Sequence, residues 1–191
     1  MNMNTFDFSI DICLGYHCFG GGEYTTGEGK LQLDDASLEK LVALIRESGG
    51  ERDIEALSLS ERLPEVYSVI TEAAHEAIQE ACHRHWVLEG FRQGCYEESG
   101  DLMTTLEEKG LFHFEPDPND IDEDTDEEDL EYLKEDAFSE WLDSYLDSLS
   151  EKDRVDFIET HYTTDEYEDV CDPYEYDILV PEGIMELARG R

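Results

Sequence analysis

The sequence predicts an α+β fold, in which a small, mainly antiparallel sheet is covered by helices. Segments of alternating apolar and polar residues stand near both ends of the chain, and segments with helical periodicity lie between them. The alternation leaves one face of each strand polar, which disfavours a doubly wound parallel sheet. With 191 residues, of which 39% are hydrophobic, the chain is long enough to bury a core. We expect one domain over residues 1–191.

Two strands are predicted at the start of the chain. Residues 5–14 alternate cleanly, with apolar side chains from Phe6 to Leu14 on one face and mostly polar ones on the other. A glycine-rich connection leads to residues 24–33, which we expect to form an antiparallel partner strand. Together the two segments predict a half-buried hairpin.

The glycine-rich connection has part of the spacing of a phosphate-binding loop. Gly15 and Gly20 are separated as that motif requires, but Gly21 stands where the lysine that reaches the phosphates belongs. We therefore interpret the segment as a hairpin loop.

Six helices are predicted after this hairpin. An aspartate cap and a Gly49-Gly50 terminator bound the first, over residues 36–48. Pro64 opens the longest, over residues 64–90, because the first turn of a helix does not need the N–H that proline lacks. The other predicted helices cover residues 101–109, 127–149, 152–162 and 182–189, and the other predicted strands cover residues 111–115 and 174–180.

Charge is the most unusual feature of the chain, which has 51 acidic and 13 basic residues and a net charge of −38. Binding to nucleic-acid backbone or to an anionic membrane needs a basic surface, so we expect neither partner. The charge is uneven, because residues 1–95 carry a net −10 and residues 96–191 a net −28. The most acidic part includes residues 115–126, which we expect to form an acidic loop or disordered insert.

The sequence predicts neither export nor a membrane anchor. No apolar stretch approaches the roughly 18 residues of a membrane-spanning helix, and the first residues lack the basic and apolar segments of a secretory signal. The cysteines are odd in number and unclustered, which fits a reducing compartment better than a disulfide framework. We therefore expect a cytoplasmic protein.

Six carboxylates between residues 120 and 131 match the ligand positions of a calcium-binding loop. Thr125 stands where such a loop needs glycine for its sharp turn, and a stretch this acidic matches any carboxylate template easily. We keep divalent-cation binding at this segment as an alternative function. The six residues are Asp120, Asp122, Asp124, Asp126, Glu128 and Glu131.

Cysteines and histidines form one group early in the chain and another in the longest predicted helix. Structural zinc sites pair their ligands within each half of the site, whereas Cys82 and His83 point about 100° apart on a helix. His85 falls on the apolar side of that helix, so we interpret it as a packed histidine and predict no cofactor. The early group is Cys13, His17 and Cys18.

Carboxylates recur at helical spacing on two of the predicted helices. Like charges at this spacing weaken a helix by roughly 0.2–0.5 kcal/mol per pair, so the core must offset them. One interpretation is a solvated face selected for solubility, and the other is a surface that imitates a polyanion. The residues are Glu72, Glu76 and Glu80 in the longest helix, and Asp136, Glu140, Asp143 and Asp147 in the helix over residues 127–149.

The leading hypothesis is a non-enzymatic interaction protein whose anionic face binds a basic partner, such as the surface of a nucleic-acid-binding protein. Its size and acidity are similar to those of proteins that act as DNA mimics, which is a resemblance of composition alone. No motif sets a nucleophile beside a base, so the sequence predicts no catalytic residue. An enzyme of unrecognised type and a divalent-cation-binding protein both stay open as alternatives. If the carboxylates are scattered over the whole molecule, the sequence describes only a well-dissolved acidic domain.

Overall fold

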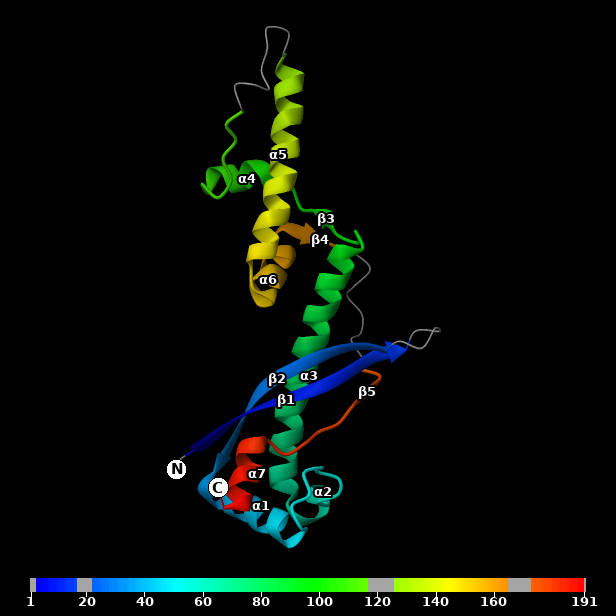
Figure 1. Ribbon diagram of the computed structural model, residues 1–191, viewed down its shortest axis with the longest axis vertical. Coiled ribbons are helices and arrows are strands. Elements are labelled where there is room, and N and C mark those ends of the chain that lie inside the picture. Colours follow the sequence, from blue (N-terminus) through cyan, green and yellow to red (C-terminus); the bar gives the residue numbers. More distant parts are fainter. Residues whose placement is uncertain (1–2, 17–21, 117–125, 165–172, 191) are drawn as a thin grey trace. The chain divides into compact units, whose positions relative to one another are not determined.

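The computed structural model describes residues 3–16, 22–116, 126–164 and 173–190, and its fold is the predicted α+β. Over this part of the chain it has seven helices, one three-stranded antiparallel sheet and one two-stranded sheet (Figure 1). All six predicted helices are confirmed to within two residues at each end. None of the described helices is both long and apolar enough to span a membrane.

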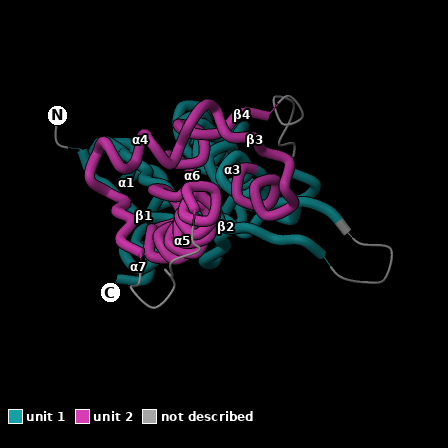
Figure 2. Tube along the Cα trace, turned by 90° about the horizontal axis from the view of Figure 1, so that it is seen from above, with its two compact units in different colours: residues 1–86, 170–191 teal, residues 87–169 magenta. Residues whose placement is uncertain are grey.

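The chain divides into two compact units (Figure 2). The first consists of residues 1–86 and 170–191, and the second of residues 87–169. Buried clusters lie within each unit, one around Leu41 in the first and one around Phe138 in the second. The expectation of one domain over residues 1–191 stays a prediction, because compactness does not decide whether two units unfold together.

A long hairpin forms the sheet of the first unit (Figure 1). β1 (Met3–Tyr16) pairs antiparallel with β2 (Gly22–Asp34), with a register shift near Gly15. β5 (Glu175–Tyr176) pairs with the other edge of β1 around Ile12, which gives the strand order β2-β1-β5. The hairpin buries alternate residues, as its period-two pattern predicts, except that Cys13 is buried next to Ile12. Its buried hydrophobic residues are Ile10, Ile12, Cys13, Leu31 and Leu33.

Helices cover one face of this sheet. Asp34 caps the first of them, since its carboxylate accepts a hydrogen bond of 2.7 Å from the Ser37 N–H. The backbone of the longest helix passes so close to Gly27 that a Cβ there would lie 2.8 Å from the Ala77 carbonyl oxygen. The helices of this unit are α1 (Asp35–Glu47), α2 (Leu59–Arg62), α7 (Glu182–Arg189) and the part of α3 (Pro64–Arg92) that precedes residue 87.

The strand predicted over residues 174–180 is shorter than expected, because only Glu175–Tyr176 pairs with β1. The alternation of apolar residues continues, but the backbone of residues 179–180 pairs with residues 52–53 instead. The Val180 N–H donates to the Arg52 carbonyl over 2.9 Å. The pattern therefore identified an extended segment correctly but not its partner.

In the second unit, short helices and aromatic rings pack against one acidic helix. Phe112, Phe138 and Ile158 are among its buried side chains, and its two-stranded sheet is antiparallel. Its elements are the end of α3, β3 (Glu97–Glu98), α4 (Leu102–Glu108), α5 (Glu127–Ser148), α6 (Glu151–His161) and β4 (Tyr162–Thr163).

The strand predicted over residues 111–115 is wrong, because this segment has no regular structure. Its alternation reflects two inserted rings: Phe112 is 4% exposed and Phe114 is half-buried against the same core, whereas Leu111 is 48% exposed. The Phe112 ring lies 5.1 Å from that of Phe138, and this contact replaces the pairing of a strand. Of the predicted acidic insert at residues 115–126, positions 117–125 lie outside the described residues.

Candidate functional site

The start of α5 explains how so acidic a sequence forms a helix. The Asp126 carboxylate accepts hydrogen bonds from the Glu128 and Asp129 N–H groups, at 2.9 and 3.1 Å. The Asp129 carboxylate accepts one in return from the Asp126 N–H, which completes a capping box. Negative charge in the first turn is also favoured by the helix dipole. The local sequence therefore stabilises the helix end on which much of the acid lies.

Aromatic packing fixes the rotation of α5 about its axis. Phe138 and Leu146 are buried in the second unit. Between them, the half-buried Trp141 ring stacks on Tyr145 at 4.9 Å and lies 5.4 Å from Phe112. Because side chains three and four positions apart share a helix face, the opposite face is directed to solvent.

Four of the predicted site residues share that solvent face, and we call them the α5 stripe. They follow one another at intervals of four, three and four residues and all are exposed. Asp129, seven residues before the first of them, falls on the same face and was missed by the sequence analysis, although a two-turn spacing could have identified it. The α5 stripe consists of Asp136, Glu140, Asp143 and Asp147.

Few cations oppose these carboxylates. Lys134, the basic residue of α5, holds its ammonium 2.6 Å from the Glu107 carboxylate of α4. Arg154 of α6 lies 3.7 Å from Asp147 at the C-terminal end of the stripe. Within the described residues, the other three members of the stripe form no ion pair. The stripe is therefore an anionic surface with one counter-charge in the described part of the chain, Arg154, near its last carboxylate.

The carboxylates of the second unit also affect a buried phenol, that of Tyr162. Burial, together with the charges of Glu98 and Asp143, raises the pKa of Tyr162 to about 12. Burial likewise raises the pKa of Glu98, as does the charge of Asp101. Asp143 thus belongs both to the exposed stripe and to the electrostatic surroundings of the core.

The carboxylates predicted on α3 are also exposed. Glu72, Glu76 and Glu80 lie along the part of α3 that belongs to the first unit. The opposite side of the helix is buried at Ala74 and Ala81. The two acidic stripes belong to different units, and each is a surface of its own unit.

The structure gives no support to the predicted calcium loop. Asp120, Asp122 and Asp124 lie outside the described residues, and one oxygen of Asp126 already accepts two backbone N–H groups. The exposed Glu128 and Glu131 complete the predicted set. No group of three His, Cys, Asp or Glu side chains that could hold a metal occurs in the described ranges.

The packed interpretation of His85 is confirmed. Its Nε2 lies 2.8 Å from a Glu23 carboxylate oxygen, and its ring meets Trp86 edge to face at 5.7 Å. Cys13 in β1 and Cys82 in α3 are both buried. The remaining early candidates, His17 and Cys18, lie outside the described residues.

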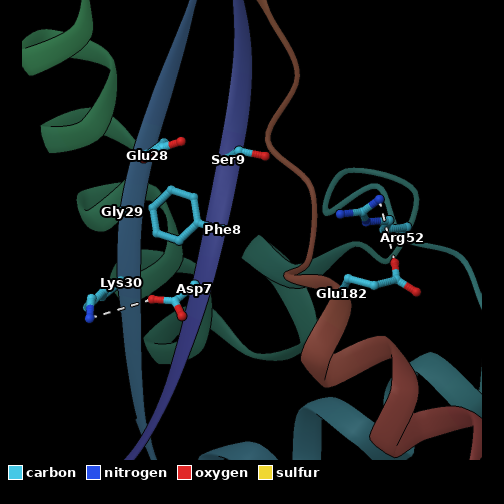
Figure 3. A pocket seen from close by; sticks show the side chains of 8 residues that line it. All are labelled: Asp7, Phe8, Ser9, Glu28, Gly29, Lys30, Arg52 and Glu182. Atoms are coloured by element: carbon cyan, nitrogen blue, oxygen red, sulfur yellow. Dashed lines mark ion pairs between the residues drawn. The ribbon is translucent and has the colours of Figure 1, made fainter. Parts of the chain in front are cut away.

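A groove of about 630 Å³ in the first unit offers a different kind of site (Figure 3). Its two cations already have carboxylate neighbours, since Lys30 lies 3.7 Å from Asp7 and Arg52 lies 3.6 Å from Glu182. Ser9 supplies a hydroxyl, but no histidine or cysteine is among the described residues that line the groove. Asp7, Glu28 and Lys30 also line it, but in the described part of the chain the Ser9 hydroxyl forms no hydrogen bond with a group that could act as its base.

Comparison of the chain with models of protein families, with curated proteins and with solved structures finds no match. The functional argument therefore depends on the geometry and charge of the described residues.

Proposed function

We propose that this protein is a non-enzymatic interaction protein whose α5 stripe binds the basic surface of a partner. The observation that carries the proposal is the fixed rotation of α5, which directs its carboxylates to solvent and leaves three of the four without an ion pair in the described part of the chain. A basic surface would be drawn to such a face by long-range attraction and would associate quickly.

The density of charge favours a partner that ordinarily binds nucleic acid. α5 carries nine acidic residues, all exposed, over 22 residues, which is about 33 Å of helix, or roughly one carboxylate per 3.7 Å. A single strand of B-form DNA carries about one phosphate per 3.4 Å of axis. On the solvent face alone, Asp129 and the α5 stripe place five of these carboxylates over a separation of 18 residues, which is about 27 Å, or roughly one carboxylate per 5 Å. A surface of lysine and arginine built for a phosphate backbone would therefore meet a linear charge of the same order on this face.

The charge of the second unit supports the same proposal. Residues 87–169 contain 30 acidic and 5 basic residues, so the unit has a net charge of −25. A stripe within such a unit is reinforced by its surroundings, because neighbouring carboxylates add to the potential within a Debye length of about 8 Å. We place this activity in the cytoplasm, because the cysteines are odd in number and unclustered, which fits a reducing compartment.

The salt dependence of binding tests this proposal. The probe is a purified histone, a basic nucleic-acid-binding protein, and its dissociation constant for the full chain is measured from 50 to 300 mM NaCl. We expect saturable binding that weakens by about tenfold across this range, because salt screens exposed charges. Absence of binding at 50 mM, or an affinity that does not change with salt, would contradict the proposal.

A further inference from the structure

A second groove lies wholly within the first unit, between α3 and the chain around β5. It has a volume of about 540 Å³ and is open to solvent. Ile78 of α3 and Ile178 form its apolar part, and Tyr67 and Tyr176 line it as aromatic groups. Tyr176 is 41% exposed, so part of its ring is accessible to a ligand.

The polar side chains of this groove are one carboxylate, one imidazole and several hydroxyls, which belong to Glu72, His75, Tyr67, Ser68, Thr71 and Tyr176. Glu72 lines it and is exposed, and Glu76 follows one turn later on the same helix. The Thr71 hydroxyl is used within the helix, where it donates to the carbonyls of Tyr67 and Ser68 at 2.9 and 3.1 Å. Neither lysine nor arginine is among the described residues that line the groove. A cation would therefore find a counter-charge in Glu72, whereas an anion would find neither lysine nor arginine among the described lining residues.

We infer that this groove binds an arginine side chain from an extended segment of a basic partner. The guanidinium group pairs with a carboxylate in a planar geometry and is attracted to aromatic faces, and both groups are present in Glu72 and Tyr176. Its aliphatic stem suits the isoleucine surface. Lysine suits the groove less well, because its ammonium is a strongly hydrated point charge.

The inference deepens the proposed function, because it names the side chain that the basic partner presents to the first unit. The arginine site differs in location from the α5 stripe, since the groove is formed by α3 and residues 176–178 and its described lining contains no residue of α5. The two ideas can therefore fail separately.

The test uses the full chain and the blocked tripeptide acetyl-Gly-Arg-Gly-amide, with the lysine and all-glycine tripeptides as comparisons. Backbone amide shifts are followed by NMR during titration. We expect saturable shifts at residues 67–78 and 175–178, with the arginine peptide binding more tightly than the lysine peptide. Glu72→Gln and Tyr176→Leu should each weaken binding by about two- to fivefold, whereas Glu39→Gln on α1, which is exposed and lies outside the groove and the α5 stripe, should leave it unchanged.

Shifts that do not saturate, that are equal for the glycine peptide, or that spread evenly over α5 and α3 would overturn the inference. Both groove variants should keep the amide spectrum of the folded chain, because the two side chains are exposed. If the arginine peptide binds at the groove while the histone fails to bind, the inference stands and the α5 proposal is wrong. If the histone binds and the arginine peptide does not, the α5 proposal stands and the inference about the groove is wrong.

Discussion

Trp141 is the residue on which the direction of the α5 stripe most depends. Its ring stacks on Tyr145 with an interplanar angle of 12° and on Phe138 with an angle of 24°. These contacts hold one side of α5 against the core, and the stripe is exposed because it lies on the other side. A core residue can in this way decide where the proposed binding surface points.

We expect Trp141→Ala to lower the free energy of unfolding by about 3 kcal/mol, at the lower end of the range for large aromatics because the ring is half-buried. Urea unfolding followed by circular dichroism measures the change. Tyr132→Ala on the same helix is the matched control, since Tyr132 is 70% exposed, and it should cost less than about 0.5 kcal/mol. A loss below about 1 kcal/mol for Trp141→Ala would mean that α5 packs differently.

A second prediction at the scale of single residues concerns Gly27. A methyl group at Gly27 would meet the Ala77 backbone of α3, which cannot move like the end of a flexible side chain. We expect Gly27→Ala to destabilise the chain by about 1–3 kcal/mol. Gly15→Ala is the control, because an added Cβ at Gly15 has nothing within 4 Å. Equal effects at the two glycines would contradict the close contact between β2 and α3.

At the scale of elements, the capping box of α5 is the feature most open to a simple test. Asp126→Ala removes the acceptor of two N–H groups and should cost about 1 kcal/mol. The amides of Glu128 and Asp129 should then exchange faster with deuterated solvent, while those near Phe138 should not change. Asp126→Asn is the control, because asparagine can still cap. Identical exchange in both variants would show that the cap does not hold this end.

Periodicity predicted the long elements well because each buries one face. The hairpin and the six helices all have enough residues for a repeated pattern. By contrast, α2 has four residues and β3 and β4 have two each, which is too short for any period to be visible. Residues 111–115 were misread for a related reason: two rings, the buried Phe112 and the half-buried Phe114, pack into a core and leave the same pattern as a strand over so few positions.

The candidate site was predictable in part for the same reason. The spacing of Asp136, Glu140, Asp143 and Asp147 depends only on the helix, so the sequence alone was sufficient to group them. The ion pair between Arg154 and Asp147 depends on how α6 packs beside α5, and no spacing along the chain encodes it. The groove between α3 and residues 176–178 likewise joins segments about a hundred positions apart.

At the scale of the whole molecule, self-repulsion of a net charge of −38 opposes the folded state. We expect the melting temperature to rise by several degrees between 10 mM and 0.5 M NaCl, because screening relieves this repulsion. Differential scanning calorimetry across the series measures the effect. Choline chloride at equal ionic strength is the control for specific sodium binding. A melting temperature that is flat over this range would contradict concentrated acidic surfaces.

The proposed function requires that the position of the charge matters, and not only its amount. Two variants of equal net charge separate these possibilities, since each neutralises three exposed carboxylates. The α5 variant is D136N/E140Q/D143N and the control variant is E39Q/E51Q/E186Q. The control residues belong to the first unit and lie outside both the α5 stripe and the α3 groove.

Titration of labelled histone with each variant at 100 mM NaCl, followed by fluorescence anisotropy, tests the central claim most directly. The account predicts that the α5 variant binds at least about tenfold more weakly than the unmodified chain, a loss of roughly 1.4 kcal/mol, and that the control changes by less than twofold. Equal weakening in the two variants would show that only net charge attracts the histone, which would contradict the account.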